Sequence, residues 1–173
     1  EIGLQIANKP DSQDICFVSD DDYASFIEEE SDQKIPEGNF VTPDGKILGR
    51  HKGIIHYTIG QRKGLGLSLG HQAFVLEIRP DTNEVVIGTN EDLMTTRVRA
   101  NKLNFMTVED LEGEMRVFAK IRYNHKGDWC TVRKTGEDEI ECIFETPQRA
   151  VTPGQALVLY DGDYVLGGGT ILG

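Results

Sequence analysis

The sequence predicts a mainly β protein built from two small antiparallel β domains, with one short helix near the amino terminus. Only one segment has the spacing of an amphipathic helix, and the chain after Pro36 consists of short β-branched or alternating apolar runs. Turn-forming residues separate these runs at short intervals. Strands at this spacing favour small barrels, because a sheet that closes on itself has no exposed edges.

The predicted helix covers residues 20–28, and Ser19 or Asp20 can cap it. Its acidic residues gather at the amino end, where the helix dipole favours negative charge. Apolar side chains share one face of the helix, namely Tyr23, Phe26 and Ile27. We therefore expect a short surface helix just before the first β domain.

The strands follow in order along the rest of the chain. They are predicted at residues 53–59, 73–78, 84–87, 98–105, 115–123, 130–133, 140–144, 156–160 and 164–166. Turn residues lie at 42–45, 80–83, 136–138 and 161–162. With no low-complexity linker to mark it, the boundary between the two domains is placed at residues 92–99.

The composition is that of an ordinary globular protein of 173 residues, with 38% hydrophobic and 27% charged residues. No apolar run approaches the length needed to cross a bilayer, so no membrane role is expected. Three cysteines without a CxxC pair argue against a disulfide framework and against a zinc site, and favour a reducing cytoplasm. The four histidines lack metal-binding spacing, so no metal is expected.

Charge is distributed unevenly along the chain, whose formal net charge is −11. Residues 1–45 hold twelve acidic and two basic side chains, whereas residues 46–76 hold five basic side chains and no acid. A second basic stretch without interleaved acids consists of Arg116, Lys120, Arg122 and Lys126. These stretches are compatible with a polyanionic partner, and equally with a solvated strand face.

Two kinds of cysteine are distinguished by their surroundings. Cys16 follows a polar, turn-forming stretch and begins an apolar one, so it is either a reactive thiol at a strand end or an inert buried one. Cys130 and Cys142 alternate with polar neighbours inside predicted strands, as core residues do. We interpret both as core residues.

The glycine-rich segment 60–70 is only weakly similar to a phosphate-binding loop. A nucleotide loop should lead from a strand into a helix, and here a strand-like run follows. We interpret it as a flexible β-hairpin loop, whose tip residues Arg62 and Lys63 would suit an RNA backbone. Taken alone, the sequence is typical of a binding module.

Five ordered motifs, read together, identify a family resemblance. They are KPDSQDICFV, GKILGRHKGIIHYTIGQRKGLGL, KIRYNH, AVTPGQALVLYDGD and VLGGGTI, spread from residue 9 to residue 171. With these motifs the chain resembles the tRNA-specific 2-thiouridylases. The resemblance implies that residues 1–18 end an otherwise missing ATP-pyrophosphatase domain, that residues 19–95 form a central β domain, and that residues 96–173 form a translation-factor-like β-barrel.

The resemblance also implies a reaction and its residues. ATP, bound by the missing domain, would adenylate the wobble uridine of tRNA, and sulfur from a donor protein would replace the activated oxygen. Cys16 matches the cysteine that carries this sulfur as a persulfide, and a second cysteine of the missing domain would release the product or form a disulfide. By this match, tRNA and a sulfur-carrier protein are the partners of this chain. The chain without the ATP-binding domain is expected to be inactive.

Arg122, Tyr123 and Gln155 match positions that contact tRNA in the family, whereas contact by Arg62 and Lys63 rests on charge alone. The acidic segment 20–32 departs from what an RNA-binding surface requires, and would face the sulfur donor or solvent. We expect a cytoplasmic monomer. Two rival readings stay open, namely an RNA- or ribosome-binding β module without catalysis, and a protein-interaction barrel.

Overall fold

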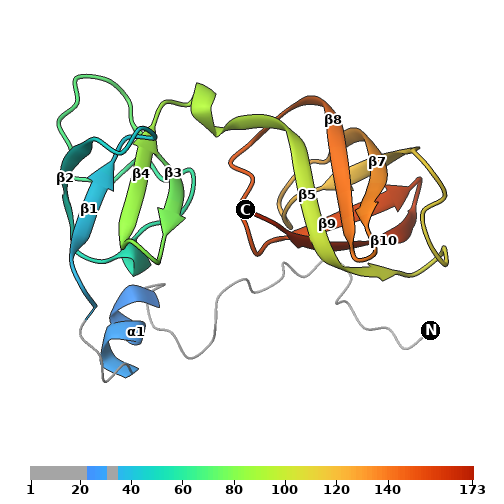
Figure 1. Ribbon diagram of the computed structural model, residues 1–173, viewed down its shortest axis with the longest axis horizontal. Helices are drawn as coiled ribbons and strands as arrows, with labels where there is room; N and C mark the ends of the chain where they lie inside the picture. Colours follow the sequence, from blue (N-terminus) through green and yellow to red (C-terminus); the bar gives the residue numbers. More distant parts are fainter. Residues whose placement is uncertain (1–22, 31–34) are drawn as a thin grey trace, which may run out of the picture. The chain divides into compact units, whose positions relative to one another are not determined.

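The computed structural model describes residues 23–30 and 35–173, and is shown in Figure 1. The chain divides into two compact units, residues 1–36 and 37–173. The first unit contains helix α1 (Tyr23–Glu30), which confirms residues 23–28 of the predicted helix and continues beyond them to Glu30. No described helix is long and apolar enough to span a membrane.

The second unit begins with a four-stranded sheet. Its strands are β1 (Gly38–Val41), β2 (Ile47–His51), β3 (Phe74–Arg79) and β4 (Glu84–Gly88), in the order β2-β1-β4-β3. The β1–β2 and β3–β4 pairs are antiparallel, but β1 runs parallel to β4. This sheet is therefore mixed, which the expectation of antiparallel pairing did not include.

The connection between β2 and β3 is not the hairpin loop expected from its glycines. These two strands lie at opposite edges of the sheet, so residues 52–73 cross from one edge to the other. The strand predicted at 53–59 is also absent there, and a 3-10 helix spans Ile54–His56. Tertiary packing explains the difference, because Tyr57 and Leu65 of this connection are buried in the core of the sheet.

Strands β1 and β2 were missed by sequence reasoning, although the turn between them was predicted. Each is short and contains a glycine, which weakens the strand signal. The turn closes through Gly45, whose φ of 86° suits glycine, and whose amide donates to the carbonyl of Thr42 at 2.9 Å. The hairpin contributes Phe40 to a buried cluster with Val75, Val85 and Ile87.

Residues 94–171 form a closed six-stranded barrel. Its strands are β5 (Met94–Phe105), β6 (Met115–Lys120), β7 (Asp128–Gly136), β8 (Glu139–Arg149), β9 (Ala156–Asp161) and β10 (Tyr164–Ile171). They are paired in the order β10-β5-β8-β7-β6-β9, and β9 closes the ring by pairing with β10. Every predicted strand from residue 98 onward is present, and the mainly β class with a barrel is confirmed.

The barrel interior is filled by alternate side chains from all six strands, as the period of a half-buried strand requires. Cys130 and Cys142 are completely buried there as free thiols, which confirms that they are core residues. A hydrogen bond with Cys130 and burial raise the pKa of the Cys142 thiol far above its usual range. This thiol therefore stays protonated and unreactive.

Candidate nucleic-acid interface

A groove of about 500 Å³ runs along the outer wall of the barrel over β6 and β9. The two strands are antiparallel neighbours in which Phe118 faces Tyr160 and Lys120 faces Val158. Because side chains alternate along a strand, these residues point outward while Ala119 and Leu159 fill the core. The groove is lined by Lys120, Arg122, Tyr123, Ala156, Val158 and Tyr160.

Two of the predicted tRNA-contacting residues, Arg122 and Tyr123, lie in the turn that follows β6. The amide of His125 donates to the carbonyl of Arg122 at 3.1 Å, and the amide of Ile121 donates to Nδ1 of His125 at 3.4 Å. Tyr123 is 70% exposed at this turn. These bonds give the turn a defined shape, so the exposed side chains are presented from a fixed backbone.

A network of polar side chains lies next to this turn. The carboxylate of Asp128 accepts hydrogen bonds from the hydroxyl of Thr146 and, at 3.0 Å, from the amide of Gln148, which is only 4% exposed. The bond from Thr146 is the largest cause that holds the pKa of Asp128 below its usual value. Burial and then the charge of Arg122 lower the pKa of His125, while a hydrogen bond with Gln148 opposes them. His125 is thus kept neutral at neutral pH.

Arg149 contacts the first sheet, the segment that follows β4, and Arg122 of the groove. The carbonyl of Arg149 accepts a bond of 3.2 Å from Nη1 of Arg122. Its own guanidinium donates to Oδ1 of Asn90 at 3.0 Å and lies 5.3 Å from the ring centre of Phe74. Arg149 therefore ties the position of Arg122 to residues far away in the sequence.

Gln155 lies in the turn that leads into β9, beside the groove-lining Ala156. The backbone amide of Gln155 donates to the carbonyl of Thr152 at 3.2 Å, and Gly154 has a φ of 84°. Pro153 followed by a glycine of positive φ is typical of a type II turn. The fold thus places Gln155 at the same end of the β6–β9 pair as Arg122 and Tyr123, which are more than thirty residues earlier.

Arg62 and Lys63 are exposed in the long connection of the first sheet, and they do not line the groove. The side chain of Gln61 shapes their segment, because it accepts a bond of 2.9 Å from the amide of Thr58 and donates one of 3.1 Å to the carbonyl of Lys63. These two bonds brace the backbone on either side of Gln61. Whether these two cations contact RNA stays a prediction.

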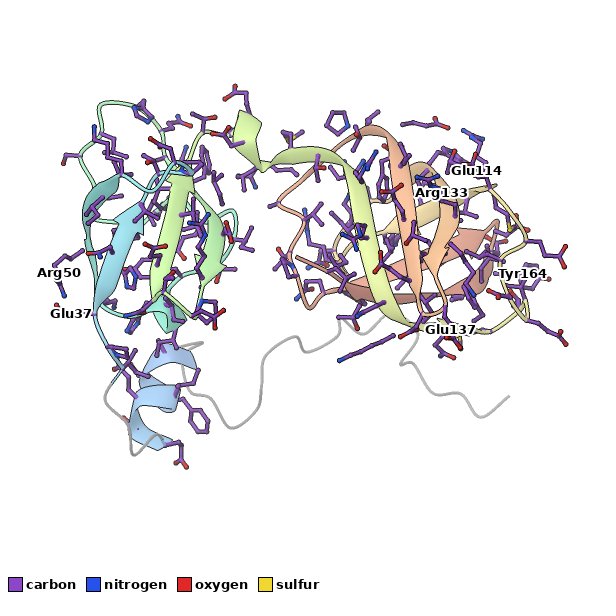
Figure 2. All side chains as sticks on the ribbon, in the orientation of Figure 1. Glu37, Arg50, Glu114, Arg133, Glu137 and Tyr164 are labelled. Carbon is purple, nitrogen blue, oxygen red and sulfur yellow. The ribbon has the colours of Figure 1, made fainter. Side chains whose placement is uncertain are left out.

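The cations of the groove differ from several of those elsewhere in residues 35–173. Several basic side chains away from it are paired with carboxylates at 2.7–3.6 Å, as in Arg116 with Glu145 and in Arg50 with Glu37, the latter visible in Figure 2. Arg133 is likewise bonded to Glu141 at 2.8 Å. Among residues 35–173, by contrast, no carboxylate lies within ion-pair distance of Lys120, Arg122 or Arg149.

This arrangement provides positive charge, two tyrosines and an amide on one wall of an acidic protein. Local charge of this kind suits a polyanion, because more distant charges are screened within about 10 Å at 0.1 M salt. The residues that the structure describes contain no cluster of acidic, histidine or cysteine side chains fit for a metal. Cys16 lies outside the described residues, so its assignment as the catalytic thiol stays a prediction.

Tyr160 and Arg149 are parts of this region that sequence reasoning missed. Tyr160 alternates with Val158 as the outward face of a strand, but only the pairing of β9 with β6 places it beside Lys120. Arg149 lies directly before the AVTPGQALVLYDGD motif, which gave the one available signal. Both depend on contacts between distant segments.

Two family models match the chain. A model described as the tRNA methyl transferase PRC-barrel domain matches residues 24–89. A model described as the aminomethyltransferase beta-barrel domain matches residues 95–171. The second match coincides closely with the closed barrel.

Similar proteins named tRNA-specific 2-thiouridylase MnmA occur in several bacteria. The protein of Lachnoclostridium phytofermentans is 67% identical over 99% of this chain and 48% of its own length. Those of Clostridioides difficile and Acetivibrio thermocellus are each 51% identical over 99% of this chain, and over 47% and 48% of their own lengths. The chain thus spans about half the length of these relatives.

Proposed function

The chain belongs to the tRNA-specific 2-thiouridylase family, of which it carries two β domains, and we propose that the full-length protein attaches sulfur to a uridine of tRNA. The observation that supports this most is the 67% identity, over 99% of the chain, to a protein of that name. The descriptions of the two family models speak of methyl transfer to tRNA and of aminomethyl transfer. We favour thiolation because the relatives that match along nearly the whole chain bear the thiouridylase name.

The proposed chemistry has three steps. The C2 oxygen of the wobble uridine attacks the α-phosphorus of ATP, and pyrophosphate leaves. The terminal sulfur of a persulfide on Cys16, loaded by a sulfur-carrier protein, then attacks C2, and AMP leaves with the former oxygen. A second cysteine, from the ATP-binding domain, attacks the sulfur of Cys16, which leaves thiouridine and a disulfide.

The described part of the chain would serve this reaction by holding tRNA. Arg122 offers a planar fork of donors to phosphate, Tyr123 an exposed ring, and Gln155 an amide for a sugar or base edge. The support for this role is that the fold brings all three to one end of the groove, where cations have no carboxylate partner among residues 35–173. Arg62 and Lys63 would add phosphate contacts from the first sheet.

Incorporation of labelled sulfur into tRNA tests the reaction. The full-length protein, supplied with ATP, tRNA and a sulfur donor, is compared with its Cys16→Ser variant and with Cys130→Ala as the matched control. We expect thiolation to disappear in the first variant and to persist in the second, since Cys130 is buried in the barrel core. Full activity of Cys16→Ser would exclude Cys16 as the sulfur carrier.

The alternative function is an RNA- or ribosome-binding β module without catalysis. The same groove supports it, because the binding residues named above need no chemistry. It predicts that a full-length protein with intact Cys16 binds tRNA but never incorporates sulfur, whatever donor is supplied. Sulfur incorporation by the native protein would exclude this alternative.

A further inference from the structure

The groove contains two residues that the assignment of tRNA contacts does not use, Tyr160 and Lys120. The ammonium group of Lys120 lies 5.9 Å from the ring centre of Tyr160. On the other side, Tyr160 faces Phe118 across the β6–β9 pair, and Phe118 faces Trp129 across the β6–β7 pair. Three aromatic side chains therefore form one row across three neighbouring strands on the outside of the barrel.

The lining of the groove is more apolar than a phosphate contact requires. Between Tyr123 and Tyr160, the wall is formed by Ala156 and Val158. Double-stranded RNA would offer phosphates and ribose to such a wall, and its bases would stay stacked inside the helix. An unpaired nucleotide offers both a flat base for an aromatic ring and a phosphate for a cation.

We propose that the groove binds an unpaired nucleotide of tRNA, with its base against Tyr160 and its phosphate against Lys120. This nucleotide is not the one that is modified, because no cysteine of the described residues lines the groove and Cys130 and Cys142 are buried behind the wall. The proposal rests on the tRNA-binding function proposed above. It adds that unpaired RNA is preferred over duplex at this wall.

An acidic peptide is the competing occupant, since it would also be attracted by Lys120 and Arg122. It has no planar group to cover Tyr160, and it leaves the apolar floor at Val158 in contact with its backbone. Stacking on an aromatic ring tolerates every base, so the groove needs no particular sequence. The observations therefore favour RNA, and an acidic peptide becomes an arm of the test.

The first experiment measures the affinity of the 173-residue chain for hexauridylate, hexaadenylate and a blunt RNA hairpin, at low salt. Its variants are Tyr160→Ala, Tyr160→Phe and, as the matched control, Tyr164→Ala, which removes a tyrosine that is 73% exposed outside the groove. Tyr164 is marked in Figure 2. We expect Tyr160→Ala to weaken binding of both single strands about tenfold, the size of one lost base stack. Tyr160→Phe and Tyr164→Ala should stay within about twofold, because the first keeps the ring and the second never touches RNA.

The second experiment separates the two roles by salt. Lys120→Gln should lower the slope of log affinity against log salt by about one, because one phosphate contact is lost. Tyr160→Ala should lower affinity at every salt concentration and leave that slope unchanged. A merely structural role for either residue would move the unfolding midpoint and not this pair of readouts.

Each unfavourable result has a distinct meaning. The groove proposal is overturned if Tyr160→Ala binds the single strands as tightly as the native chain, or if Tyr160→Ala and Tyr164→Ala weaken binding equally. The proposal is also overturned if hexaglutamate displaces the single strands from the native chain and binds it more tightly than they do. If the native chain binds no RNA even at low salt, the proposed tRNA-binding role of these domains fails as well. If the chain binds the hairpin, and Arg122→Ala weakens this binding while Tyr160→Ala does not, the tRNA-binding role stays intact and only the groove proposal fails.

Discussion

Arg122 has a donor to spare after its contact inside the protein is made. One Nη1 bond goes to the carbonyl of Arg149, and a guanidinium has five N–H donors in a fixed plane. The internal bond orients the group, and Arg122 lines the groove. Arg122 is therefore positioned for a bidentate phosphate contact without the loss of much side-chain freedom on binding.

Substitution of Arg122 should separate charge from geometry. We expect Arg122→Ala to weaken tRNA binding about tenfold and to lower the salt slope by about one, because one phosphate contact is lost. Arg122→Lys should restore the slope and only part of the affinity, since an ammonium cannot form the fork. Filter binding across a range of salt concentrations measures both quantities, and equal affinity of all three proteins would contradict this role.

His51 is a structural histidine of the first sheet and not a ligand. It is buried, its Nε2 donates to the carbonyl of Asn83 at 3.2 Å, and its Nδ1 accepts from the amide of Gly53 at 3.1 Å. This pair of bonds requires the neutral ring. Burial is the largest cause that lowers the pKa of His51, and the charges of Arg50 and His56 add to it against the bond to Asn83.

The stability of the first sheet should therefore depend on pH through His51. Because the folded-state pKa lies below 6.5, the unfolded chain takes up a proton first as the pH falls. The contribution of the neutral ring is complete above pH 6.5 and is lost as the pH falls from there toward the folded-state pKa. Urea unfolding at pH 7.5 and 5.5 should show a larger loss for the native chain than for His51→Gln, and equal losses would contradict the assignment.

The turn between β6 and β7 is the element that presents Arg122 and Tyr123. It ends at Gly127, which has a φ of 83° and lies against the ring of Phe118. A Cβ at this position would overlap that ring and would also be strained by the positive φ. The turn thus needs glycine at this position for two reasons. The φ is positive, and the ring of Phe118, a member of the aromatic row on the barrel wall, occupies the space of a side chain.

Gly113 supplies a matched control for Gly127, since its φ is 73° and a Cβ there would meet no atom within 4 Å. We expect Gly113→Ala to cost about 1 kcal/mol of unfolding free energy, the backbone strain alone. Gly127→Ala should cost about 1–3 kcal/mol more, because the Phe118 ring must move. Urea unfolding measures the loss of unfolding free energy in both variants. Equal losses would mean that the Phe118 ring moves aside at no cost.

At the scale of the whole molecule, residues 37–173 contain two separate hydrophobic cores. One is the buried cluster around Phe40 and Val85, and the other fills the barrel. Bonds such as that of Arg149 with Asn90 join the two regions, but no buried residue belongs to both clusters. A core of its own is what a domain needs in order to fold independently.

We accordingly expect residues 92–173 to fold when they are produced alone. The isolated barrel keeps its own core and loses contacts with the first sheet such as that of Arg149 with Phe74. Trp129, the single tryptophan of the chain, lies on the barrel wall and reports its unfolding by fluorescence. A cooperative urea transition would support the predicted domain boundary, and a gradual one would contradict it.

Sequence reasoning succeeded where a signal was local. The alternation of Cys130 and Cys142 with polar neighbours predicted that they are core residues, and the turn residues at 42–45 predicted the turn that closes through Gly45. It failed for the connection 52–73, because the β-branched pair Ile54 and Ile55 suits a strand locally while packing across the sheet decides its conformation. The parallel β1–β4 pair escaped for the same reason, since no local pattern shows which strands become neighbours.

By itself, the sequence determined the mainly β class, the barrel strands, the buried Cys130 and Cys142, and the family. These depend on alternation, turn residues and ordered motifs, which a linear chain displays directly. Only the tertiary structure decided that Arg122, Tyr123 and Tyr160 share one groove and that its cations lack carboxylate partners within residues 35–173. The physical reason is that strand pairing brings together side chains nearly forty residues apart, and charge pairing is settled by that proximity and not by the order of residues.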